Sequence, residues 1–171
     1  MFFYNSLRFN LKKKKFVIKC FKPKEVTKDY VKGLNNNKFV RYNIEKKILV
    51  SDQKKYIDKT NKSKNNIIFG LFNKKKLIGT IGSQKKTKNK CYIGILIFDK
   101  EYLGIGLSKI MIKKAAKILK LNSQVLYLLA SVNEKNKISH KLFKSLGFNE
   151  NFTEPKILKK DKIYSIKVSE I

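Results

Sequence analysis

Two glycines lie two residues apart in Gly104-Ile105-Gly106, and a stretch with helical periodicity follows them directly. A strand that leads into a glycine turn and then a helix points several unpaired N–H groups at one spot, where the helix dipole adds positive charge. Because glycines have no side chain, a phosphate can approach this backbone closely. The segment predicts either an anion-binding turn, with Lys109 adding charge at its rim, or a turn that serves packing alone.

Motif spacing excludes two common phosphate-binding loops at this turn. No Gly-Lys-Ser/Thr follows at the spacing of a Walker loop, and the third glycine of a dinucleotide-binding fingerprint is absent. A Gly-x-Gly pair by itself is a weak indication of function, so the motif alone leaves both interpretations open.

Other residue types that often carry chemistry are sparse in this sequence. His140 is the only histidine, and Cys20 and Cys91 lie far apart and outside any CxxC pair, so they do not form a metal-ligand set. No Ser-His-Asp order with a nucleophile elbow appears. We therefore expect no metal site, and two buried thiols in a reducing compartment.

Strands are predicted on both sides of the glycine turn. The stretches in which apolar residues recur with period two are 16–21, 66–72, 76–83 and 91–98. Short polar turns join the last three, which predicts an antiparallel meander. After the turn, the continuous apolar run 124–132 is typical of a strand buried on both faces, and 154–160 with 162–169 predicts a closing hairpin.

Helices are predicted in four stretches. The helix after the glycines has an apolar side made of Leu107, Ile110, Met111, Ala115, Ile118 and Leu119. Before the meander, we expect one helix within 26–34 with Thr27 as its N-cap and a second over 51–59 capped by Ser51. Near the C-terminus, 136–148 is helical, with Gly147 as terminator and with an apolar face formed by Ile138, Leu142 and Leu146.

The element order β, α, α, βββ, α, β, α, ββ predicts an α/β fold. We expect a single domain over 1–171, with a mixed, mostly antiparallel sheet of about seven strands flanked by about four helices. Residues 1–15 are expected to form a flexible segment or an edge strand.

Composition limits the classes of partner. The chain has 171 residues, 42% of them apolar, and a formal net charge of +29, which suggests nucleic acid. Only Arg8 and Arg41 are arginines, however, and the lysines are spread along the whole chain, which favours a solvated surface over a nucleic-acid site. The charge has an alternative role in attracting an anionic substrate or cofactor. No apolar run is long enough to span a membrane, the N-terminus lacks the order of a secretory signal, and we expect a cytoplasmic protein.

Two blocks of the sequence resemble the GNAT superfamily of N-acetyltransferases. The blocks are ILIFDKEYLGIGLSKIMI and SVNEKNKISHKLFKSLGF. The positions that match the family pattern in order and spacing are Asp99, Tyr102, Gly104, Gly106, Asn136, Ser139, Leu142, Phe143, Gly147 and Phe148. The N-terminal half looks like the branch that contains ribosomal-protein N-terminal acetyltransferases and acetyltransferases of nucleotide-linked amino sugars.

By this resemblance the ligand is acetyl-CoA, and the second substrate is an amine acceptor. The pyrophosphate is expected on the backbone of the turn, which comprises Leu103, Gly104, Ile105, Gly106, Leu107, Ser108 and Lys109. The pantetheine arm is expected to pair like an added strand with Leu96, Ile97 and Phe98, where the sheet splays. Asn136 would hydrogen-bond the cofactor near its reactive end.

Three positions depart from the family pattern. Leu103 replaces the usual Arg or Gln, so a side-chain contact near the phosphates is lost, and Ser108 replaces Gly or Ala. Phe143 stands where many members carry a tyrosine that protonates the leaving thiolate, and phenylalanine has no proton to give.

The resemblance offers Ser139 as the catalytic residue, because it matches a serine proposed for proton donation to the thiolate in the ribosomal-protein branch. The alternative is a helix serine that bonds to its own backbone. His140 is expected to be structural rather than a base, and Tyr92 and Tyr164 are expected to pack in the core or at the rim. No carboxylate stands on 91–98, so no strong general base is visible; Asp99 and Glu101 are expected to shape the loop.

The sequence thus indicates an acetyl-CoA-dependent N-acetyltransferase. The acceptor would be a primary amine, either on a small molecule such as an amino sugar or at a protein N-terminus, and a homodimer is left open. Two alternatives remain: a catalytically weak acyl-CoA-binding protein of the same fold, and a basic nucleic-acid-binding protein.

Overall fold

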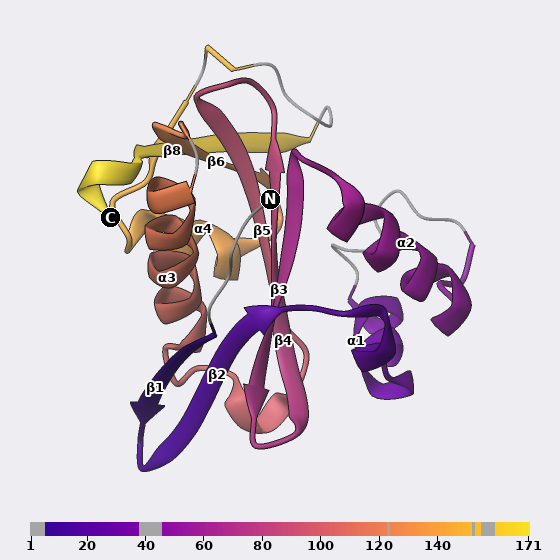
Figure 1. Ribbon diagram of the computed structural model, residues 1–171. Coiled ribbons are helices and arrows are strands. Elements are labelled where there is room, and N and C mark those ends of the chain that lie inside the picture. The colour runs from indigo at the N-terminus through magenta and orange to yellow at the C-terminus, as the bar shows by residue number, and fades with distance from the viewer. Residues whose placement is uncertain (1–5, 38–45, 123, 152, 155–159) are drawn as a thin grey trace.

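The computed structural model describes residues 6–37, 46–122, 124–151, 153–154 and 160–171, and its centre is one open eight-stranded sheet (Figure 1). The strands are ordered β1-β2-β3-β4-β5-β6-β8-β7. Their bounds are β1 Leu7–Leu11, β2 Lys14–Cys20, β3 Asn66–Asn73, β4 Lys76–Lys85, β5 Lys90–Ile97, β6 Tyr127–Asn133, β7 Asn149–Glu150 and β8 Asp161–Lys167. The α/β class and the mostly antiparallel sheet are as predicted.

Helices cover both faces of this sheet. Helices α1 (Lys28–Asn36) and α2 (Val50–Lys62) lie together on one side in Figure 1, and α3 (Leu107–Asn122) and α4 (Lys137–Lys144) lie on the other. The Thr27 side chain accepts a hydrogen bond from the Tyr30 N–H, which confirms the predicted N-cap of α1. The sheet is therefore buried between two layers of helix.

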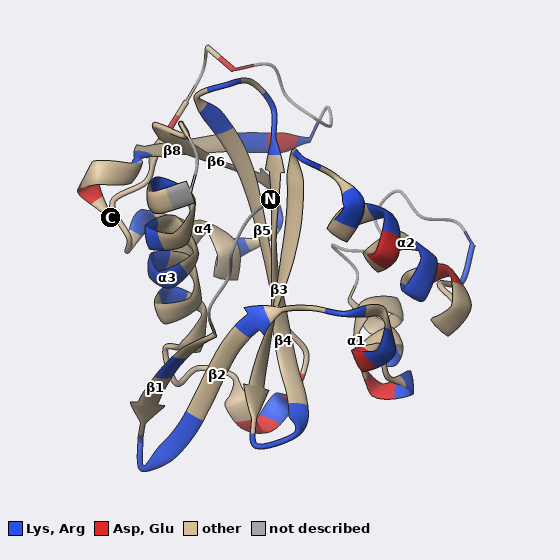
Figure 2. Ribbon diagram, viewed as in Figure 1, with Lys and Arg blue, Asp and Glu red and all other residues tan. Residues whose placement is uncertain are grey.

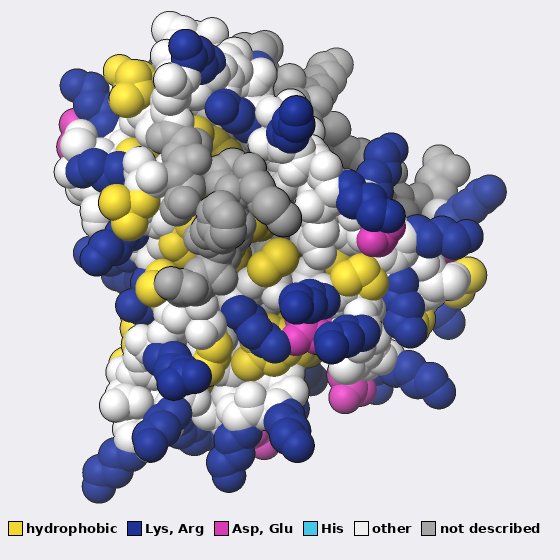
Figure 3. Space-filling model, in the orientation of Figure 1, with side chains coloured by type: hydrophobic (Ala, Val, Ile, Leu, Met, Phe, Trp, Pro, Cys, Tyr) yellow, Lys and Arg dark blue, Asp and Glu magenta, His cyan; other side chains and the backbone are white. Residues whose placement is uncertain are grey.

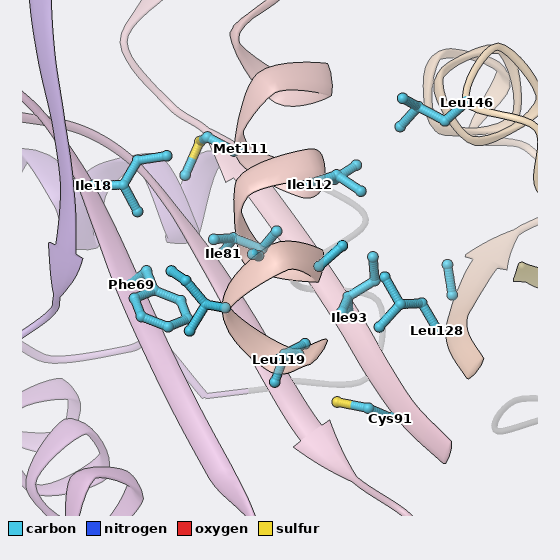
Figure 4. Packing of buried hydrophobic residues seen from close by; sticks show 14 of the residues in the cluster. Ile18, Phe69, Ile81, Cys91, Ile93, Met111, Ile112, Leu119, Leu128 and Leu146 are labelled. Carbon is cyan, nitrogen blue, oxygen red and sulfur yellow. The ribbon is translucent and has the colours of Figure 1, made fainter. Parts of the chain in front are cut away.

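Two hydrophobic cores result, one under each layer, because side chains alternate along the strands. Under α3, Met111, Ile112 and Leu119 belong to one buried cluster with Ile81 and Ile93 of the sheet (Figure 4). Under α1 and α2, the cluster of buried residues comprises Phe21, Val26, Tyr30, Val31, Leu34, Ile48, Ile57, Ile68, Phe72 and Leu77. Strands β3, β4 and β5 contribute side chains to both cores.

The sheet opens between β5 and β6. The predicted meander is confirmed, because β3, β4 and β5 pair antiparallel to one another along their lengths. Strands β5 and β6 are parallel, and they pair only from Lys90 with Tyr127 to Tyr92 with Leu129. Beyond that point β5 continues to Ile97 beside β4, and β6 continues to Asn133 beside β8. The diverging ends leave a gap in the sheet.

Several local predictions need correction. The N-cap of α2 is Leu49 without a side-chain bond, so Ser51 lies inside the helix and caps nothing. Ile138 is 82% exposed and lines the cleft, so it does not belong to the buried face of α4. This helix runs only from Lys137 to Lys144, and its buried residue is Phe143. Strand β6 begins at Tyr127 rather than at 124.

The C-terminal hairpin also differs from the prediction. The strand that pairs with β8 is β7, whose Asn149 and Glu150 face Ser165 and Tyr164. Residues 155–159 of the strand expected at 154–160 lie outside the described residues. At the other end of the chain, β1 pairs antiparallel with β2 and is an edge strand, one of the two expectations for 1–15.

Lysines are distributed over the whole fold. Figure 2 shows basic residues on the strands, the hairpin turns and every helix, and Figure 3 shows them scattered over the visible face between small apolar patches. This distribution is that of a solvated surface. Among the described residues, no helix is long and apolar enough to cross a membrane.

Candidate active site

The glycine turn lies between β5 and α3, after a short 3₁₀ helix at Lys100–Tyr102. Gly104 and Gly106 have φ angles of +75° and +88°, which L side chains rarely adopt. A Cβ added at either glycine would meet no atom of the described chain within 4 Å. The backbone conformation, and not packing against the protein, therefore requires both glycines, and the space in front of them is open.

The N–H groups of this turn are free of protein acceptors. The Leu103 N–H donates to the Lys100 carbonyl at 3.3 Å, and the Ile110 N–H donates to the Gly106 carbonyl at 3.3 Å. Between them, no N–H of residues 104–109 donates to any part of the chain that the structure describes. Free N–H groups at the start of a helix, facing open space, fit a phosphate.

Buried residues hold the turn in place. Tyr102 is buried, and its hydroxyl donates to Oδ1 of Asn73 at 3.3 Å. The Asp99 side chain accepts from the Glu101 N–H at 3.2 Å and forms an ion pair of 2.7 Å with Lys76. This ion pair raises the pKa of Lys76. Asp99 thus shapes the loop by its contacts.

A cleft of about 640 Å³ passes through the gap between β5 and β6. Residues of β5 and β6 line its length. Residues of α4 and of the glycine turn line one end, and residues at the end of α1 line the other. The lining residues are Asn36, Asn37, Ile93–Ile97, Leu103, Ser108, Ser131, Val132, Asn133, Asn136, Ile138, Ser139, Leu142, Phe143 and Asp161. Its lining therefore includes residues from both faces of the sheet.

The first turn of α4 brings Asn136 and Ser139 together at the cleft. Asn136 is the N-cap, and its Oδ1 accepts from the Ser139 N–H at 3.2 Å. The Ser139 hydroxyl makes no hydrogen bond with the described residues, so the expected alternative of a back-bonded helix serine is not observed. Phe143 lines the cleft with a ring that packs edge-on against Phe148 and is stacked with Tyr164.

The other expected aromatic and imidazole groups lie away from the cleft. Nε2 of His140 contacts the carbonyls of Asn133 and Glu134 at 3.0 and 3.2 Å, so this nitrogen carries the proton. Nδ1 of His140 therefore accepts from the Tyr164 hydroxyl at 2.9 Å. Burial raises the pKa of Tyr164. Tyr92 lies on β5 with Lys86 over its ring, and neither it nor Tyr164 or His140 lines the cleft.

One acidic residue of the cleft was missed by the sequence analysis. Asp161 begins β8 and lines the cleft because β8 pairs with β6, where it lies opposite Asn133. This pairing joins segments far apart in the chain, so a search for carboxylates on 91–98 could not find it. Within the described residues, no group of three or more His, Cys, Asp or Glu side chains could hold a metal ion.

The sequence matches the model of a known protein family. The model of the acetyltransferase (GNAT) family matches residues 34–148, which include β5, the glycine turn, α3, β6 and α4. The chain belongs to the GNAT acetyltransferase family. No protein with curated information matches the sequence.

Solved structures support the GNAT fold over nearly the whole chain. The ribosomal-protein-S5-alanine acetyltransferase from Vibrio fischeri is 16% identical, with a TM-score of 0.76, and the match covers 96% of this chain and 97% of that one. Spermidine N-acetyltransferase from Vibrio cholerae, solved with CoA and spermine, is 16% identical with a TM-score of 0.73, and the match covers 91% and 96% of the two chains.

A third solved structure is an acetyltransferase from Salmonella typhimurium that modifies the N-terminal serine of 50S ribosomal subunit protein L7/L12. It is 10% identical with a TM-score of 0.73, and the match covers 89% of this chain and 94% of that one. These neighbours act on different amines, so the likeness establishes the fold and leaves the acceptor open.

Proposed function

We propose that this GNAT protein transfers the acetyl group of acetyl-CoA to a primary amine, on a small molecule such as an amino sugar or at a protein N-terminus. One observation carries the proposal. The glycine turn offers free N–H groups to open space, and it stands at the mouth of a cleft between strands that have diverged. A long, thin ligand with phosphates at one end fits both features.

The turn and the strand would hold the two parts of the coenzyme. The N–H groups of residues 104–109 would bind the pyrophosphate. The Phe98 N–H donates to the Ile78 carbonyl at 3.2 Å, so by strand alternation the N–H and carbonyl of Ile97 point to the open side. Ile97 is therefore better placed than Phe98 to pair with pantetheine, and Asn136 lies at the same cleft.

The reaction would be a direct transfer in a ternary complex. Acetyl-CoA supplies an activated thioester. The acceptor nitrogen attacks the thioester carbonyl carbon, the C–N bond forms, the C–S bond breaks, and no covalent enzyme intermediate arises. The Ser139 hydroxyl, which lines the cleft without a partner in the described chain, would give its proton to the departing sulfur in place of the tyrosine that Phe143 replaces. The acceptor nitrogen would lose one proton, and Ser139 would regain one from solvent.

A test of this proposal combines a thiol-release screen with calorimetry. The screen measures free CoA formed from acetyl-CoA with amino sugars, polyamines and peptides with free N-termini. Calorimetry measures CoA binding by the wild type, G106A and G147A. Gly147 also has a positive φ, +86°, but lies at the end of α4, so its variant controls for backbone strain.

We expect G106A to weaken CoA binding about tenfold or more, because its methyl group enters the space of the phosphates. G147A should lose stability by about 1 kcal/mol and bind CoA as the wild type does. Equal CoA affinity of G106A and the wild type would contradict the placement of the pyrophosphate.

The second candidate is a protein that binds acyl-CoA but reacts slowly. The buried Phe143 favours it, because this ring has no proton to give at the cleft. Both candidates predict that acetyl-CoA raises the melting temperature, and only the enzyme releases free CoA with some amine of the panel.

A further inference from the structure

The cleft has a second side, opposite to the glycine turn. Ala130 and Val132 of β6 belong to the core under α3 and α4. Side chains alternate along a strand, so Ser131 and Asn133 lie on the other face, together with Asp161, which pairs with Asn133. This is the face of α1, whose end also lines the cleft. An acceptor that enters here would meet the thioester without passing the coenzyme.

Asp161 is an unusual carboxylate in so basic a protein. The structure describes two buried acidic side chains, Glu154 and Asp161, with exposures of 8% and 5%. Lys86 and Lys90 both form ion pairs with Glu154. Asp161 forms no ion pair with any described residue, despite the 41 basic residues of the chain. A buried carboxylate without a partner charge is costly, which indicates that a ligand from outside the chain supplies a hydrogen-bond donor or a positive charge there.

The surroundings hold Asp161 in position and leave one oxygen free. The Ser131 hydroxyl donates to Oδ2 of Asp161. Oδ1 of Asp161 is buried and has no hydrogen-bond partner in the described structure, and the same holds for Nδ2 of Asn133. The terminal torsion of an aspartate is soft, so a small rotation presents Oδ1 to a ligand in the cleft.

We propose that Asp161 is the catalytic residue that binds the acceptor amine and takes its proton. This inference rests on the proposed function. A neutral amine donates an N–H to Oδ1 of Asp161 and attacks the thioester carbon. As the C–N bond forms, nitrogen becomes positive and one of its protons passes to Oδ1; the C–S bond breaks, and the departing sulfur takes the proton of Ser139, which solvent replaces. Asp161 then releases the proton to solvent, and Ser131 keeps the carboxylate oriented.

The experiment compares the wild type with D161N, D161E and the control D58N. Asparagine keeps the size of the side chain and the acceptor for Ser131 but removes the proton-accepting oxygen. Asp58 is a half-exposed residue of α2 that pairs with Lys62, so D58N makes the same change of charge away from the cleft. Glucosamine, spermidine and an alanine-terminated peptide serve as acceptors, and calorimetry measures CoA binding and acceptor binding to the CoA-loaded protein.

We expect D161N to lower kcat/KM about 100-fold or more for every acceptor that the wild type uses. CoA affinity should stay within twofold, D58N should behave as the wild type, and D161E should recover part of the rate. If D161N unfolds, S131A replaces it and should lower kcat about tenfold with CoA affinity retained.

Two failures are distinguishable. If D161N transfers acetyl at a rate similar to that of the wild type, the role of Asp161 is overturned while the proposed function stands. Where D161N unfolds, the same conclusion is drawn from S131A. If no acceptor is acetylated, the proposed function fails. In that case, binding of an acceptor to the CoA-loaded protein is compared between the wild type and D161N. If the wild type binds the acceptor and D161N does not, the contact between Asp161 and the amine is supported. If both bind it equally, or neither binds it, that contact is overturned.

Discussion

Two serines of the α4 region differ in a way that bears on the reaction. The Ser145 hydroxyl donates to the Leu142 carbonyl at 2.7 Å, a local bond typical of helix ends. The Ser139 hydroxyl donates to no atom of the described chain and lies in the cleft. A polar group at a cleft without a partner is available for a ligand, whereas Ser145 is occupied by the backbone.

The variant S139A is therefore expected to keep its stability and lose activity. Its backbone N–H can still donate to Asn136, so the melting temperature should match that of the wild type. The value of kcat should fall about tenfold or more if the hydroxyl protonates sulfur. Thermal unfolding and steady-state kinetics measure both, with S145A as the control that keeps full activity. An unchanged kcat in S139A would remove this residue from the mechanism.

Residue identity alone predicts part of the site. The sequence places Gly104 and Gly106 in a turn between a strand and a helix, as the structure has them, whereas their positive φ angles and the open space before them are seen only in the structure. Asp161 was not predictable, because its place depends on which strand β8 joins. The partners of His140 are equally non-local, since Tyr164 reaches it from the last strand.

Strands with a strong period-two pattern are predicted well from the sequence. The buried face of a helix is predicted less well. The meander of β3 to β5 has side chains that must alternate between two cores, so composition and spacing identify it. Helix α4 is short, and its core contacts come from Phe143 and from Leu146 beyond its end. Ile138 is apolar but stands at the cleft mouth, which a search for one continuous apolar face could not anticipate.

One ion-pair cluster joins distant elements, and it predicts a pH effect. Lys90 and Lys86, at the β4–β5 turn, hold the pKa of Glu154 below its ordinary value of 4.5. Because the folded pKa lies below the unfolded one, the carboxylate stabilises the protein above about pH 4.5, and the stabilisation is lost as pH falls through the folded pKa.

The variant E154Q should therefore be less stable by about 1–2 kcal/mol at neutral pH. The difference from the wild type should shrink as the pH drops below the ordinary range of a glutamate. Urea unfolding near pH 7 and near pH 3 measures it, and E170Q, at an exposed position, should show no such dependence. A difference that stays constant with pH would show that Glu154 acts by packing.

At the scale of the whole molecule, the chain that carries the proposed phosphate-binding turn has a net charge of +29. A positive field attracts a polyanion such as CoA from a distance, and salt screens that attraction. We expect the Kd for CoA to rise about tenfold between roughly 50 and 500 mM NaCl. Dephospho-CoA, with less charge, should show a weaker dependence in the same titration calorimetry.

A flat response to salt would mean that the lysines only solvate the surface. The nucleic-acid alternative predicts a different result: duplex DNA would bind with steep salt dependence, and G106W would leave that binding intact. Loss of DNA binding in G106W with retained CoA affinity would reverse our assignment of the turn.

The diverging of β5 and β6 after three residue pairs also affects how the empty protein behaves in solution. Each strand has unsatisfied backbone groups there, comparable to those at the rim of a sheet, and extended segments of other chains are attracted to such groups. A pantetheine arm seated between the strands would occupy them. Storage with CoA should then suppress aggregation, so the coenzyme would act as a chaperone of the fold as well as a reactant.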